Sequence, residues 1–176
     1  MRRFFNDTKL APVVTLERHE TAVDLALCLR DARISAIEVT LRTKAALKAI
    51  ELVAYTVPDI SIGAGSVRST DQITAIKERG AKFAVSPGHS QSLIWQARAV
   101  SMPFVPRAAT ASEIMALTES GYSLMKFFPA ELLGGTKMLK ALSAPLPEVR
   151  FFPTGGINAD LIQDFNCVSC VGDSSR

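Results

Sequence analysis

The chain has 176 residues, of which 48% are hydrophobic, and its formal net charge is +3. This length is enough for one domain with a substantial core. The basic residues are scattered, no apolar run approaches the ~20 residues of a membrane span, and residues 1–7 lack the apolar stretch of a secretory signal. We therefore expect a cytoplasmic protein that binds neither nucleic acid nor membrane.

Short apolar strands alternate with amphipathic helical stretches almost to the end of the chain. Strands are predicted at residues 11–16, 34–40, 59–65, 82–86, 103–107, 123–128, 149–154 and 167–172. Helices are predicted at residues 20–31, 43–55, 69–79, 90–100, 110–120, 135–143 and 158–165. Ser69, Thr110 and Asn158 are suited to helix starts, and Gly80 and Gly121 lie where helices should stop.

This alternation predicts an α/β fold with a parallel sheet, and eight strands favour a (β/α)₈ TIM barrel made by residues 1–176 as a single domain. An open, doubly wound sheet is the structural alternative. It is disfavoured as a dinucleotide-binding fold, because no Gly-x-Gly-x-x-Gly follows the first strand. A barrel typically needs ~200–250 residues. This chain stops at Arg176, so we expect a barrel truncated after its eighth strand, without the final helix.

The cysteines and histidines do not indicate a metal or disulfide framework. The three cysteines are Cys28, Cys167 and Cys170, an odd number. The pair at 167 and 170 has C-x-x-C spacing but sits in a strand-like run, where residues three apart point to opposite faces. His19 and His89 are far apart in sequence. We expect no metal site.

Lys126 lies in the apolar run 124–129. A lysine is rarely placed in so hydrophobic a strand unless it is paired or has a chemical role. Burial disfavours the ammonium form, and a neutral amine is the nucleophile that makes Schiff bases with carbonyl compounds. The alternative is a lysine whose stem packs while its head reaches water at the end of the strand.

The end of the second strand carries three polar residues, Glu38, Thr40 and Arg42. The two-residue period of a strand puts them on one face, with Val39 and Leu41 on the other. In a barrel the polar trio would point inward at the end of the strand where active sites form. Glu38 and Arg42 could serve as a base and an anion clamp, or could form a structural salt bridge.

Other strand ends carry small residues. Residues 63–66 allow close approach to a ligand. Gly155 and Gly156 precede a helix, and their exposed N–H groups would suit a phosphate, although a Gly-Gly pair alone is more often a plain turn. Ser86-Pro87-Gly88 also indicates a turn when taken alone.

Together, a buried amine, a carboxylate, an anion-binding arginine and a phosphate-ready loop suit aldol chemistry on a phosphorylated keto acid. The amine would condense with a ketone, and the iminium would act as electron sink for carbon–carbon cleavage. The carboxylate would shuttle protons. No metal or other cofactor is needed, because the iminium replaces a Lewis acid.

Five blocks of sequence resemble the KDPG/KHG aldolase family, whose members act on 2-keto-3-deoxy-6-phosphogluconate or 4-hydroxy-2-oxoglutarate. The blocks occur in order and cover residues 38–43, 63–67, 86–88, 126–131 and 153–157. The resemblance extends from about residue 11 to about residue 172. It implies a (β/α)₈ barrel that usually assembles as a homotrimer and binds a small keto acid.

The resemblance also implies residue roles. Lys126 corresponds to the Schiff-base lysine and Glu38 to the general acid/base. Arg42 would hold the pyruvoyl carboxylate, together with Ser66, which stands where the family often has threonine. Pro87 and Phe128 would line the pocket. The phosphate and distal-substrate positions correspond to Thr154, Gly155, Gly156 and Ser174.

Three features depart from the family pattern. Arg107 stands where the family usually has glycine, so we expect it to crowd the pocket and to favour a neutral Lys126. Asp173 brings a negative charge near the proposed phosphate. The segment beyond Arg176, where the family has a further helix, is absent. Two alternatives therefore stay open: a degenerate aldolase-like barrel with little activity, and a phosphate-binding barrel without Schiff-base chemistry.

Overall fold

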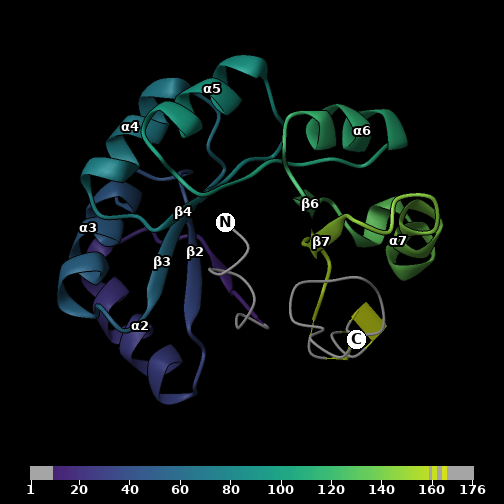
Figure 1. The fold of residues 1–176 in the computed structure, drawn as a ribbon. Coiled ribbons are helices and arrows are strands. Elements are labelled where there is room, and N and C mark those ends of the chain that lie inside the picture. Colours follow the sequence, from purple (N-terminus) through teal and green to yellow (C-terminus); the bar gives the residue numbers. More distant parts are fainter. Residues whose placement is uncertain (1–9, 159, 162–163, 166–176) are drawn as a thin grey trace. The chain divides into compact units, whose positions relative to one another are not determined.

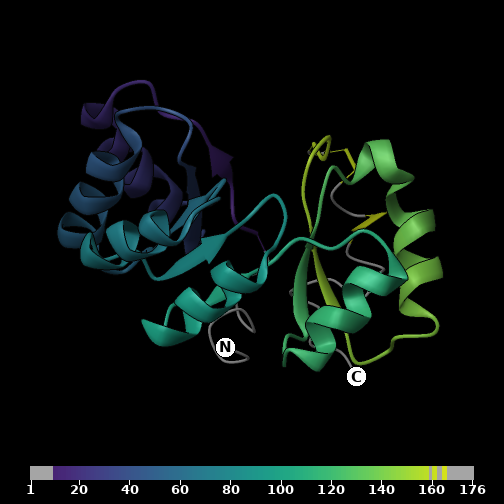
Figure 2. The ribbon, with the colours of Figure 1, turned by 90° about the horizontal axis from the view of Figure 1, so that it is seen from above.

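The structure is a computed structural model that describes residues 10–158, 160–161 and 164–165. The chain divides into two compact units: one is Leu10–Phe104, and the other includes the residues from Val105 onward. In both units parallel strands alternate with helices along the chain (Figures 1 and 2). Each unit therefore has the α/β organisation that the sequence predicts.

The first unit is built on a sheet whose strands stand in sequence order, β1 to β5. Neighbouring strands from β1 to β4 pair in parallel. The strands are β1 (Val13–Val14), β2 (Ala36–Thr40), β3 (Ser61–Gly65), β4 (Phe83–Val85) and β5 (Phe104–Val105), the last of which ends at the first residue of the second unit. The helices are η1 (His19–Thr21), α2 (Ala22–Asp31), α3 (Ala46–Thr56), α4 (Thr70–Glu78) and α5 (Gln91–Ala99).

Helices α2 to α5 lie in an arc outside strands β2 to β4 (Figure 1). All five residues of β2 are buried, as expected for a parallel strand covered on both faces. The largest fully buried side chains of this unit are Ile37, Ile50, Ile60, Ile62, Ile73, Ile76, Phe83 and Phe104. Because β2 is covered on both faces, its polar residues Glu38 and Thr40 lie inside the protein, at 0% and 1% exposure.

The second unit contains strands β6 (Leu124–Phe127) and β7 (Arg150–Pro153), which pair in parallel. Its helices are α6 (Ala111–Glu119), η2 (Glu131–Leu133) and α7 (Gly135–Ser143). The rings of Phe127 and Phe151 meet edge to face, with centroids 6.2 Å apart and planes at 72°. Both rings are fully buried and form the centre of this unit's core.

The helix starts and stops follow the local sequence signals. Ser69 caps α4 in a capping box with Gln72, and Thr110 caps α6 in a capping box with Glu113. Gly80 follows the end of α4 with a φ of 81°, and Gly121 follows α6 with a φ of 76°. These left-handed conformations suit glycine, and the predicted boundaries at these helices are confirmed.

Several elements are shorter than predicted. Strand β1 covers only Val13–Val14, where residues 11–16 were predicted. Helix α3 begins at Ala46, not at residue 43, and the Thr43 hydroxyl donates to the Leu16 carbonyl at 2.6 Å. Strand β5 ends at Val105 because Pro106 has no N–H to donate to a strand ladder. Pairing resumes as a single parallel bridge between Arg107 and Lys126.

The predicted strand at 167–172, with Cys167 and Cys170, lies outside the described residues, as do parts of the predicted helix at 158–165. Cys28 carries a free, exposed thiol. Within the described ranges, no helix is long and apolar enough to cross a membrane.

Candidate active site

Lys126 is the third residue of β6 and is only 6% exposed. Its N–H donates to the Pro106 carbonyl at 2.8 Å, and its own carbonyl accepts from the Ala108 N–H at 3.0 Å. The Nζ atom lies 5.5 Å from the centre of the Phe128 ring. This burial argues against the alternative in which the ammonium reaches water at the end of the strand. The backbone hydrogen bonds fix the strand at Lys126, and the buried side chain places the amine beside an aromatic face.

The polar trio of β2 divides between the core and the surface. Glu38 and Thr40 are buried, and the Thr40 hydroxyl lies 2.8 Å from that of Thr15. Arg42 follows the strand and is exposed, and its Nε donates to the Ser66 hydroxyl at 3.1 Å. The structure pairs Arg42 with Ser66, whereas the salt-bridge alternative predicted Glu38 as its partner. Two residues assigned to the same substrate carboxylate are therefore brought together.

The Glu38 side chain lies against the backbone of the next strand, at Gly65. The two strands are in parallel register, with Thr40 opposite Gly65. A β-carbon built on Gly65 would lie 2.0 Å from the Glu38 Oε1 atom. The carboxylate therefore fills the space that a side chain at position 65 would need.

Ser66 has a φ of 58°, in the left-handed region that residues other than glycine rarely adopt. This conformation is held on both sides, because Leu41 donates to the Gly65 carbonyl at 2.8 Å and Val67 donates to the Val85 carbonyl at 3.1 Å. Non-glycine residues in such conformations are enriched at functional sites.

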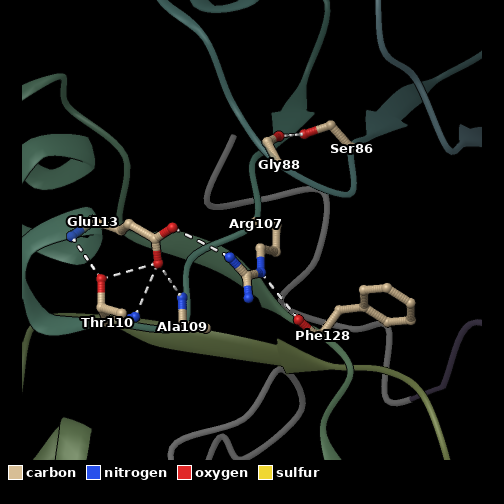
Figure 3. Close-up of polar contacts among 7 residues, drawn as sticks. All are labelled: Ser86, Gly88, Arg107, Ala109, Thr110, Glu113 and Phe128. Atoms are coloured by element: carbon tan, nitrogen blue, oxygen red, sulfur yellow. Dashed lines mark hydrogen bonds and ion pairs between the residues drawn. The ribbon is translucent and has the colours of Figure 1, made fainter. Parts of the chain in front are cut away.

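In the loop after β4, a side chain forms a hydrogen bond with the backbone of the same loop. The buried Ser86 hydroxyl donates to the Gly88 carbonyl (Figure 3). Pro87 lies between them and is exposed. The backbone bends at Pro87 and Gly88, and the pocket role of Pro87 stays a prediction.

The loop after β7 packs on the segment that follows Lys126. The Thr154 carbonyl accepts from Ala130 at 2.8 Å, and the Gly155 carbonyl accepts from Glu131 at 3.1 Å. Gly155 and Gly156 have φ values of 97° and 82°. A β-carbon on Gly156 would lie 2.6 Å from the Glu131 Cβ. Both the backbone conformation and the packing thus require glycine at position 156.

Arg107, the main departure from the family pattern, is held by a local network (Figure 3). Its backbone bridges to Lys126, its Nε donates to the Phe128 carbonyl at 3.0 Å, and its Nη1 donates to the Glu113 Oε1 atom at 3.2 Å. The Glu113 carboxylate thus balances the guanidinium charge. The sequence missed this pairing, although it did identify Thr110 and Glu113 as a helix start.

The other oxygen of Glu113 completes the cap of α6. Its Oε2 atom accepts from the N–H groups of Ala109 and Thr110 at 2.9 and 3.0 Å, and from the Thr110 hydroxyl at 3.0 Å. Partial burial raises the pKa of Glu113, but these hydrogen bonds and the charge of Arg107 outweigh it. The net result is a pKa below the ordinary value of 4.5.

The predicted site residues belong to both units. Glu38, Arg42, Ser66 and Pro87 lie in the first, and Lys126, Phe128, Thr154, Gly155 and Gly156 lie in the second. Ser174 and Asp173 lie outside the described residues. In the part of the chain that the structure describes, no group of three His, Cys, Asp or Glu side chains is placed to hold a metal ion.

Comparisons with known proteins point to one family, and the matches cover most of the chain. A model of the KDPG and KHG aldolase family matches residues 2–175. The KHG/KDPG aldolase of Escherichia coli K12 is 39% identical, over 94% of this chain and 79% of that protein. The 2-dehydro-3-deoxy-phosphogluconate aldolase of Treponema pallidum is 43% identical, over 89% of this chain and 75% of that protein.

Solved structures agree with this. The KDPG aldolase of Legionella pneumophila, with pyruvate captured as a covalent carbinolamine intermediate, is 40% identical. Its TM-score is 0.91 over 96% of this chain and 82% of that one. These relatives are aldolases, and together with the parallel α/β organisation they place the chain among the α/β-barrel carbon–carbon lyases. The chain belongs to the KDPG and KHG aldolase family.

The family assignment settles several predictions. The α/β fold of the (β/α)₈ type is confirmed by the solved relatives, and so are the family and the assignment to the aldehyde-lyases. The residue roles stay predictions.

Proposed function

We propose that the chain is a class I aldolase that reversibly cleaves 2-keto-3-deoxy-6-phosphogluconate to pyruvate and glyceraldehyde 3-phosphate. The second proposed substrate is 4-hydroxy-2-oxoglutarate, which would give pyruvate and glyoxylate. The observation that carries the proposal is Lys126, a lysine on a strand at 6% exposure with both backbone groups bound. Relatives named for both substrates support it.

In the proposed mechanism, the Lys126 amine attacks the C2 ketone to give a carbinolamine, which loses water to form an iminium. Glu38 removes the proton from the C4 hydroxyl as the C3–C4 bond breaks. The bonding electrons pass to the iminium, giving an enamine while the aldehyde leaves. Glu38 then returns its proton to C3, and water hydrolyses the new iminium to release pyruvate and the free amine.

Arg42 and Ser66 are proposed to hold the substrate carboxylate. The hydrogen bond between them uses Nε of the guanidinium. It therefore leaves the two terminal nitrogens as the edge for a carboxylate. Phe128 would form a wall of the pocket beside the amine, since its ring already lies against Nζ. Pro87 is proposed as a second lining residue.

Thr154, Gly155, Gly156 and Ser174 are proposed for the phosphate end of the substrate. The φ values of Gly155 and Gly156 support a loop that needs glycine for its shape, and backbone N–H groups in such loops bind phosphate. The second substrate has no phosphate and ends in a carboxylate next to its C4 hydroxyl, so it would depend less on this loop.

We further propose that residues 1–176 form a single domain that assembles as a homotrimer and works in the cytoplasm. The family resemblance supports the trimer, and the free, exposed thiol of Cys28 fits a reducing compartment. Sedimentation would detect the trimer, and a monomer at assay concentration would contradict it. Cell fractionation would test the location.

The deciding experiment is reductive trapping. The protein is incubated with pyruvate and borohydride, digested, and analysed by mass spectrometry. We expect a reduced pyruvate adduct on the peptide that contains Lys126, and none in Lys126→Ala. Lys140→Ala is the matched control, because Lys140 is an exposed lysine of the same unit. An adduct that persists in Lys126→Ala would refute the assigned nucleophile.

The second candidate is an aldolase-like barrel with little or no activity. It is favoured by Asp173, which puts a carboxylate in the segment that the resemblance assigns to phosphate. A cooperative thermal transition without turnover or adduct would support this candidate. Turnover in a defined oligomer would exclude it.

A further inference from the structure

We propose that Gly65 is a positioning residue for Glu38: because Gly65 has no side chain, it leaves the space in which the Glu38 carboxylate lies. The inference rests on the proposed function, which gives that carboxylate its acid–base role. The sequence indicated only that residues 63–66 let a ligand approach closely. In the structure, the group that approaches Gly65 is a side chain of the protein itself.

The geometry leaves no room for a larger residue. A β-carbon on Gly65 would lie 2.0 Å from the Oε1 of Glu38, 2.7 Å from its Cδ and 2.8 Å from its Cγ. Carbon atoms pack at about 3.5–4.0 Å. Even alanine would therefore overlap the whole carboxylate end. At Gly63, on the same face of β3, a β-carbon would instead meet the ring of Phe83 at 2.3 Å.

The need for glycine arises from the carboxylate and not from the backbone. Gly65 is not among the described glycines with positive φ, so its conformation is open to other residues. Alanine should therefore fit the strand itself. Its cost would come from the contact with Glu38.

Neither partner can easily move away. Glu38 is completely buried on β2, so a displaced carboxylate must push either into packed core or into the space that the proposed mechanism gives to the substrate. The Gly65 carbonyl accepts from Leu41, and the Val67 N–H donates to Val85, so backbone hydrogen bonds hold β3 here. The result of Gly65→Ala should be a shifted carboxylate in a strand that otherwise keeps its place.

A small shift of a proton-transferring group has a large kinetic effect. A misplacement of about 1 Å costs on the order of a hundredfold in rate. We expect Gly65→Ala to lower kcat by between about tenfold and about a hundredfold. It should slow deuterium exchange of the pyruvate methyl group in heavy water by a similar factor. Once pyruvate has formed its iminium on Lys126, that exchange needs only removal of a methyl proton to give the enamine and return of a deuteron.

The test compares wild type, Gly65→Ala, Glu38→Gln and the double variant. Each is assayed for kcat, methyl exchange and borohydride trapping of pyruvate. Ile62→Val is the matched control, because Ile62 is a fully buried neighbour on the same strand whose truncation lowers stability modestly. Its exchange rate should stay at the wild-type value.

If Gly65 acts through Glu38, the double variant will exchange no more slowly than Glu38→Gln alone, because residues acting as one unit are not additive. Effects that multiply, or a Gly65→Ala protein that exchanges like wild type, would overturn the inference. The proposed function fails separately, when wild type itself gives neither an adduct on Lys126 nor exchange. Should Gly65→Ala not fold, the comparison is repeated between Glu38→Asp alone and Glu38→Asp in the Gly65→Ala background, because the shorter side chain withdraws from the added β-carbon. If this double variant folds no better than Gly65→Ala, the clash is not with the Glu38 carboxylate and the inference is overturned.

Discussion

The Nε atom of Arg107 donates a hydrogen bond to the backbone carbonyl of Phe128 at 3.0 Å. The same guanidinium pairs with Glu113 of α6, so it joins the end of β6 to the start of a helix. Phe128 is the residue whose ring lies beside the Lys126 amine. A residue that departs from the family pattern is therefore linked to the wall of the proposed pocket.

Replacing Arg107 with methionine should lower the free energy of unfolding by about 1–2 kcal/mol. The loss is limited because solvent partly screens the ion pair, whose side chains are 23% and 34% exposed. Urea denaturation of wild type and Arg107→Met would measure it. Arg107→Lys keeps the charge but cannot present the same fork of donors, so it should recover only part of the loss. Full recovery by lysine would show that the bond to Phe128 contributes nothing.

Glu113 should make stability depend on pH in the acidic range. Its pKa in the folded protein is lowered, so there the unfolded chain binds more protons and stability rises with pH. The contribution is complete above the ordinary value of 4.5 and is lost as the pH falls through the folded pKa. The neutral side chain in Glu113→Gln keeps the capping box but does not titrate. The difference in unfolding free energy between the two proteins should therefore shrink from about pH 6 to about pH 3. A constant difference would contradict the assigned pairing.

Local sequence signals predicted much of the fold. The capping boxes at Ser69 and Thr110 each depend on residues three apart, and the structure has both. The apolar run around Lys126 also predicted a strand, because a fully covered parallel strand is apolar along its length. The structure has this strand, β6, with all four residues buried. These features need no knowledge of distant parts of the chain.

The relationships that organise the candidate site are non-local, and this is why the sequence missed them. Gly65 meets Glu38 only through the register of β2 and β3, which brings together residues 27 positions apart in the numbering. The partner of Arg107 depends on where α6 begins. The sequence therefore indicated candidate site residues, whose roles stay predictions, but it did not predict how Arg107 and Gly65 are accommodated.

Ser66 should separate substrate binding from stability. Both Ser66→Ala and Ser66→Gly remove the hydroxyl that accepts from Arg42, so both should raise KM for substrate to a similar extent. Alanine keeps the cost of the left-handed backbone at a φ of 58°, whereas glycine removes it. Strain relief of about 1–2 kcal/mol in Ser66→Gly is offset by about 0.4–1 kcal/mol of extra unfolded-state entropy.

Ser66→Gly should therefore be about as stable as wild type or slightly more so, and more stable than Ser66→Ala. Thermal unfolding gives the order of stability, and steady-state kinetics give KM. A KM that rises in Ser66→Ala but not in Ser66→Gly would show that the hydroxyl is not what orients Arg42.

Gly156→Ala should affect the two proposed substrates differently. A β-carbon there would lie 2.6 Å from the Glu131 Cβ, and the φ of 82° disfavours alanine, so the loop after β7 must shift. If this loop holds the phosphate, KM for 2-keto-3-deoxy-6-phosphogluconate should rise by about tenfold, equivalent to about 1.4 kcal/mol. KM for 4-hydroxy-2-oxoglutarate should change little, because that substrate carries no phosphate.

Gly134→Ala separates this effect from a general loss of stability. Gly134 has a φ of 99°, so alanine meets the same backbone penalty, but its β-carbon would come no closer than 3.4 Å to Met138. Gly134 lies between η2 and α7, outside the proposed phosphate loop. The Gly134→Ala protein should be less stable than wild type, while its KM values for the two substrates should not change. Equal increases for the two substrates in Gly156→Ala would place the loop near the part that they share, which runs from the C1 carboxylate to the C4 hydroxyl.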